Sequence, residues 1–146
     1  MQPTFLTKAR RLTELVMSLY GIYFGTLVVM LLDTGWGNPL YWVWPDQDEQ
    51  KLVGLAFLTA GVIHAIGVNL NGSWRWSPAL RVVGLTLHTG LMASIFWAGA
   101  WQEPNGVTSG GITYLPFVLV FGFFAFAAFR DLVQSLRLWS AIDGLS

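Results

Sequence analysis

The two histidines are the residues of this chain whose chemistry and spacing suggest a site. His64 and His88 lie in consecutive apolar stretches, residues 52–70 and 82–101. If both stretches are helices joined by a short loop, each imidazole lies about 8–10 Å inside the same end, at about 1.5 Å per residue. Two imidazoles at one depth on adjacent helices are what a bis-histidine haem b requires. Gly61 and Gly84, one turn away, would leave room for the macrocycle.

A structural role is the simpler interpretation of the same pair. Histidines inside membranes hydrogen-bond across helix interfaces, and nearby polar residues could accept such bonds: Thr59, Asn69, Thr86 and Thr89. A proton relay is a third alternative, because ionisable groups within membranes are often functional. Zinc needs more ligands than two histidines, so the sequence predicts no metal site. We therefore predict no cofactor, with haem b bound by His64 and His88 as the alternative.

Composition excludes several function classes. The chain has no cysteine, which removes thiolate metal sites and cysteine nucleophiles. A net charge of zero gives a nucleic-acid partner no electrostatic support. Pumps and coupled carriers place charges and broken helices within their spans, and neither pattern is present. The sequence predicts no catalytic residue, and hence a protein that is not an enzyme.

The elements that must position the histidines are membrane-spanning helices. The chain is 54% hydrophobic and only 11% charged, a composition suited to lipid. Its four apolar stretches, residues 12–32, 52–70, 82–101 and 112–129, approach the roughly 20 residues that cross a bilayer. We predict an all-α integral membrane four-helix bundle as a single domain over residues 1–146. The apolar spacing continues as an amphipathic extension over residues 130–139.

Basic residues set the predicted orientation. They gather in the N-terminal tail, the second loop and the C-terminal segment: Lys8, Arg10, Arg11, Arg75, Arg81, Arg130 and Arg137. In the first loop Lys51 is the only basic residue, and the third loop has none. Under the positive-inside rule both termini are therefore cytoplasmic.

Two further sets of residues have predicted structural roles. Tryptophan and arginine at the ends of the spans are predicted to anchor the protein at the lipid interface: Trp42, Trp44, Trp74, Arg75, Trp76, Arg81, Trp97 and Trp101. Small residues at helical spacing are predicted to let helices approach closely: Gly21, Gly25, Gly61, Ala65, Gly90, Ser94 and Ala98. These contacts would either seal one bundle or join several copies.

One segment resembles a known group of proteins. Gly61, His64 and Gly67, followed by Asn71-Gly72, Ser77-Pro78, Arg81 and Gly84, resemble small uncharacterised membrane proteins of tailed bacteriophages and prophages. The resemblance covers residues 61–84 only, and Ser73 and Trp74 stand where the group has a more basic turn. It implies a location in the bacterial cytoplasmic (inner) membrane and no assigned activity.

Three functional hypotheses follow. The first is a non-catalytic membrane protein, of phage type, that acts by self-assembly or by binding a membrane partner, either as a holin-like permeabiliser or in superinfection exclusion. The second is an accessory subunit of a larger membrane complex. The third is a b-type cytochrome. The predicted partners are the lipid bilayer and either copies of the chain or other membrane subunits.

The orientation can be tested without knowing the function. Reporter fusions at Ser146 and in the second loop should be cytoplasmic, and fusions after Asn38 or Asn105 should be external. Neutral residues in place of Arg75 and Arg81 should weaken the orientation, since the second loop has no other basic residue. An external C-terminus would contradict an even number of spans.

Overall fold

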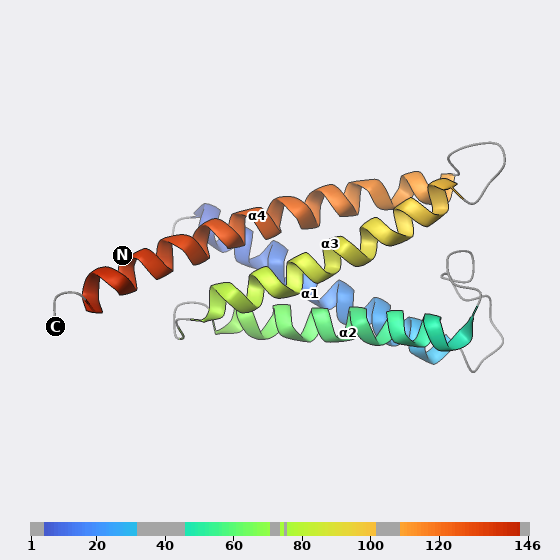
Figure 1. Cartoon of the computed structure of the whole chain (residues 1–146), viewed down its shortest axis with the longest axis horizontal. Helices are drawn as coiled ribbons and strands as arrows, with labels where there is room; N and C mark the ends of the chain where they lie inside the picture. The colour runs from blue at the N-terminus through green and yellow to red at the C-terminus, as the bar shows by residue number, and fades with distance from the viewer. Residues whose placement is uncertain (1–4, 32–45, 71–73, 75, 102–108, 144–146) are drawn as a thin grey trace.

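A computed structural model describes residues 5–31, 46–70, 74, 76–101 and 109–143. Over these residues the chain forms four α-helices and no strand (Figure 1). The helices are α1 (Phe5–Leu31), α2 (Gln47–Asn69), α3 (Ser77–Trp101) and α4 (Ser109–Asp143). The predicted all-α, four-helix fold is confirmed.

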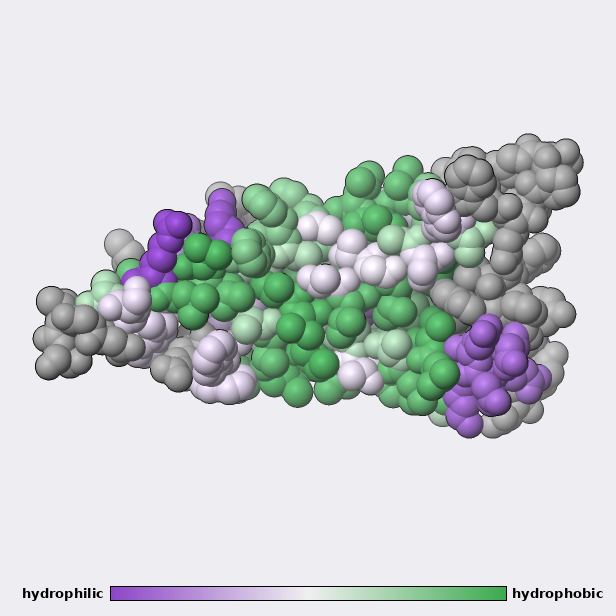
Figure 2. Space-filling view, in the orientation of Figure 1, coloured by the Kyte–Doolittle hydropathy of each residue, from purple (hydrophilic) through white to green (hydrophobic). Residues whose placement is uncertain are grey.

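Each helix is long and apolar enough to cross a membrane. Figure 2 shows a broad apolar band around the middle of the molecule, with hydrophilic residues near both ends. The hydrophilic group at one end coincides with the start of α2, where Asp46, Asp48 and Glu49 are exposed. This distribution matches a protein whose long axis crosses the bilayer, because lipid accommodates the apolar band and water the ends.

All four helices begin before the predicted spans. At the start of α2, the Asp46 side chain accepts a hydrogen bond from the Asp48 backbone N–H, which caps the helix. At the other extreme, α4 includes the predicted amphipathic extension and runs for 35 residues. Since α4 begins at Ser109, Pro116 lies inside the helix.

The helices pack in chain order. Helix α2 lies along α1 and α3, and α3 lies along α4. The core between them is aromatic and aliphatic: Phe24 and Val28 of α1 meet Phe57 of α2 and Met92 of α3. Helix α4 covers this core from one side only. Of its span, 11% is buried, against 33–39% for the other helices.

Glycine allows the closest of these approaches. A Cβ added to Gly25 would lie 2.5 Å from the carbonyl oxygen of Gly54, and one added to Gly61 would lie 2.6 Å from the backbone nitrogen of Ile22. Gly21 faces the ring of His88 in the same way. These three glycines therefore lie at helix–helix contacts within one bundle.

The predicted small-residue contact on α3 lies elsewhere. A Cβ on Gly90 would meet no atom within 4 Å, and Ser94 is also exposed. The bundle interface of α3 is formed instead by residues such as Leu85, Met92 and Ile95. The sequence prediction that Gly90 and Ser94 could seal the bundle is wrong, while their use between copies stays a prediction. Ala98 is partly buried, and Ala65 lines a shallow apolar groove between α1 and α2.

Alanine substitution should separate the two kinds of glycine. Gly25→Ala forces backbone atoms of α1 and α2 apart, and such overpacking costs about 1–3 kcal/mol of folding free energy. Gly90→Ala is the matched control, because its new methyl group has open space and alanine favours helix by about 1 kcal/mol. Unfolding in mixed micelles should show loss of stability for the first variant and none for the second. Equal effects would contradict the packing described here.

Candidate functional site

A buried ion pair joins α1 to α3. The Arg81 guanidinium donates two hydrogen bonds to Glu14, from Nε to Oε2 and from Nη2 to Oε1, both 2.6 Å long. Glu14 is 1% exposed and Arg81 4%. Such a two-pronged contact fixes both side chains in orientation as well as position.

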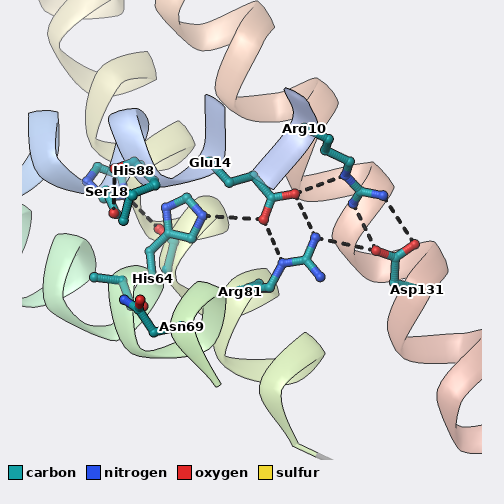
Figure 3. Close-up of polar contacts among 11 residues, drawn as sticks. Arg10, Glu14, Ser18, His64, Asn69, Arg81, His88 and Asp131 are labelled. Carbon is teal, nitrogen blue, oxygen red and sulfur yellow. Dashed lines mark hydrogen bonds and ion pairs between the residues drawn. The ribbon is translucent and has the colours of Figure 1, made fainter. Parts of the chain in front are cut away.

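Two more charged side chains extend this pair to α4. Arg10, one turn before Glu14 on α1, donates from Nε to Oε1 of Glu14 at 2.9 Å. Its Nη2 lies 2.9 Å from Oδ2 of Asp131 on α4, and Nη2 of Arg81 lies 3.4 Å from the same oxygen. Figure 3 shows the four side chains converging from three helices. We call Arg10, Glu14, Arg81 and Asp131 the charge cluster.

The charge cluster is balanced and lies at one end of the bundle. Two arginines face two carboxylates, so their formal charges cancel. The side chains of Arg10 and Asp131 are about a quarter exposed, so the charge cluster reaches the molecular surface through these two residues. We call this end the charged end; α1 and α3 begin there, and by the sequence prediction it faces the cytoplasm. Removing one partner of a buried ion pair destabilises the fold, because the other charge is then left buried and uncompensated.

His64 brings the remaining helix, α2, to the charge cluster. Its Nε2 lies 3.9 Å from Oε2 of Glu14, which is too long for a hydrogen bond. The imidazole is fully buried, and neither ring nitrogen has a hydrogen-bond partner among the described residues. Gly84 of α3 makes this position possible, since a Cβ there would lie 2.6 Å from the Cβ of His64.

His88 lies farther from the charge cluster than His64 and is held differently (Figure 3). Its Nδ1 lies 2.9 Å from the carbonyl oxygen of Gly84, which accepts the ring N–H, so in the neutral imidazole Nε2 carries no proton. That Nε2 faces Gly21 and has no hydrogen-bond partner among the described residues. The ring also stacks on Phe121, with centroids 5.0 Å apart. The predicted bonds from the histidines to threonine or Asn69 are absent from the contacts described for these two rings.

The histidine pair is close, as its predicted depth required, with ring centroids 6.2 Å apart. A bis-histidine haem needs two ring nitrogens directed at opposite faces of one plane. Here one Nε2 is directed at Glu14 and the other at the backbone of α1, and the rings meet at 62°. This arrangement does not fit a haem, and the predicted haem b site gains no support. Among the described residues, no group of three potential metal ligands occurs.

The predicted interface anchors have mixed outcomes. Trp74, Trp76 and Trp97 are exposed near helix ends, where anchoring side chains belong. Arg81 is a correction: it faces the bundle interior, because Glu14 offers it a carboxylate that the lipid-facing side does not. Trp42, Trp44 and Arg75 lie outside the described residues, and so does the side chain of Trp101.

Sequence reasoning missed the charge cluster as a site. In the sequence, Glu14 follows Arg10 by one helical turn and Asp131 lies within the predicted amphipathic extension, and neither carboxylate was assigned to a site. Arg10 and Glu14 do pair, and Glu14 is buried while Arg10 stays partly exposed. The sequence did contain a signal for this site. Charges of both signs lie at one predicted depth: Arg10 and Glu14 near the start of α1, Arg81 near the start of α3 and Asp131 late in α4.

Comparisons of the chain with protein-family models, curated proteins and solved structures found no match.

Removing the carboxylate at the centre of the charge cluster should destabilise the fold. In Glu14→Gln, Arg81 stays buried without its closest carboxylate, which costs about 3–5 kcal/mol. The exposed Glu49→Gln is the matched control and should change stability by less than about 0.5 kcal/mol. Replacing both partners, as Glu14→Gln with Arg81→Met, should recover part of the loss. Equal unfolding curves for the Glu14 and Glu49 variants would contradict a stabilising cluster.

Proposed function

We propose that the protein is a non-catalytic membrane protein that acts by self-assembly in the plane of the bilayer. The observation that supports it most is the outer face of α3. Thr86, Gly90 and Ser94 follow one another along this face at helical spacing, and all three are exposed. The glycines that face the bundle lie against a neighbouring helix, whereas a Cβ added to Gly90 would have no atom within 4 Å.

Such a face suits a second copy of the chain. Helices in lipid gain little from covering apolar surface, so they associate where small residues let backbones approach. Val83 and Leu87 flank the small residues and could pack beside them in a partner. The Ser94 hydroxyl already donates to the carbonyl oxygen of Leu91, so this polar group adds no penalty to a lipid-facing or protein-facing position.

Helix α4 favours a second candidate function, that of an accessory subunit in a larger membrane complex. Its outward side carries Leu119, Phe123 and Phe126, each 64–69% exposed, at helical spacing. Large rigid side chains of this type bury much area at a protein interface. For the first candidate function, a phage-type role as a holin-like permeabiliser or in superinfection exclusion is the concrete version to test.

Cross-linking in liposomes tests the self-assembly. Because the chain has no cysteine, Ser94→Cys introduces the only thiol, and Thr59→Cys on the exposed side of α2 is its control. We expect disulfide-linked dimers from the first variant and few from the second. Gly90→Leu should lower the dimerisation constant about tenfold, or ~1.4 kcal/mol of association free energy, with Thr59→Leu as its control.

Two results would contradict the proposal. A strictly monomeric protein at all protein-to-lipid ratios would remove self-assembly, and equal cross-linking from both cysteines would indicate random collision. Dimers that survive Gly90→Leu but fail in Phe123→Ala would move the interface from α3 to α4.

A further inference from the structure

We propose that His64 is a proton-binding site reached from the charged end of the bundle, and that binding of a proton there loosens α4. The site is the junction of α2 with the charge cluster (Figure 3). His64 is fully buried, both of its ring nitrogens lack a hydrogen-bond partner among the described residues, and Nε2 is directed at Glu14. The inference does not depend on whether copies of the chain associate.

The groups around His64 come from every neighbouring helix. Helix α1 contributes Glu14, with Arg10 on the far side of that carboxylate. Helix α3 contributes Arg81, which binds Glu14, and His88, whose ring centroid is 6.2 Å away. Helix α4 contributes Asp131 through its contact with Arg81. The ionisable groups around the ring are thus two arginines, two carboxylates and one second imidazole.

Charge balance determines what a proton would do. With His64 neutral, the charge cluster has equal numbers of positive and negative charges. A proton on Nε2 adds a third cation next to Glu14, and that cation competes with Arg81 and Arg10 for one carboxylate. A charged His64 would also repel the guanidinium groups of Arg10 and Arg81. Repulsion between like charges is strong in a low-dielectric interior. Arg10 is more exposed than Arg81, so we expect Arg10 to be the arginine that moves away from Glu14. Its contact with Asp131 of α4 is then lost.

The arrangement makes the site one-sided. Polar groups lead from Asp131, through Arg81 and Glu14, to His64. Beyond His88 the described core is mainly aromatic and aliphatic, with Phe57 and Phe121 against the ring and then the cluster around Phe24 and Met92, which Tyr20 and Tyr114 adjoin. Protons do not cross such a region without water or ionisable groups. Among the described residues the polar contacts therefore reach His64 from the charged end, which is the side from which the proposed proton would come.

Distance measurements in lipid nanodiscs test the proposal. Spin labels on Leu12→Cys and Phe129→Cys, both exposed, report the separation of α1 and α4 in an otherwise cysteine-free chain. Between about pH 8 and pH 5, where histidine titrates, the distance should lengthen and its distribution broaden. His64→Gln should remove this change and keep the distance seen at high pH. His88→Gln is the matched control and should keep the change.

Each other outcome counts against the proposal. An unchanged distance in the unsubstituted background, an unchanged response in His64→Gln, or a response lost only in His88→Gln would overturn it. If His64→Gln fails to fold, ¹⁵N-histidine spectra of the native chain replace it, because only two histidines give signals. One of them must then titrate together with the distance. In vesicles of uniform orientation, acid on the charged side alone should produce the change, and an equal response from both sides would contradict one-sided access.

Discussion

The buried ion pair between Glu14 and Arg81 constrains the rest of the fold. A carboxylate and a guanidinium inside an apolar bundle must stay within hydrogen-bond reach, which fixes the register of α1 against α3. The helices achieve this register because glycine stands where backbones would otherwise collide. A Cβ on Gly67 would lie 2.8 Å from the backbone nitrogen of Arg81, so α2 approaches the start of α3 at the level of this pair. The Glu14–Arg81 ion pair thus depends on the close helix approach that the glycines allow.

The two halves of the bundle are held by different forces. Near the charged end, directional contacts join α1, α3 and α4 through specific atoms. Toward the other end, aromatic and aliphatic packing dominates, with Tyr20 stacked on Phe24 and on Phe117. Directional contacts specify one register, whereas packing of similar side chains tolerates small shifts. The register of the helices is therefore specified at the charged end, and the packing at the other end adjusts to that register.

The sequence was sufficient for the helices and insufficient for the site. Apolar runs of about 20 residues identify spans because length and composition alone decide them. The depth of His64 and His88 was also predictable, since helical rise is constant. The rotation of each helix was not, because several faces of each span are apolar. Rotation decides that Arg81 faces Glu14, that Gly90 faces outward and that the two imidazoles are directed at different groups.

The length of α4 has a mechanical consequence. Its 35 residues are more than a bilayer requires, and twelve of them, residues 132–143, follow Asp131. As a continuous helix this segment is a stiff rod about 18 Å long, at about 1.5 Å per residue. Its base is attached to the charge cluster and its free end is not. A tilt of about 10° at the base would displace the far end by about 3 Å, by the same rise per residue. Small rearrangements among four side chains are in this way amplified at the membrane surface.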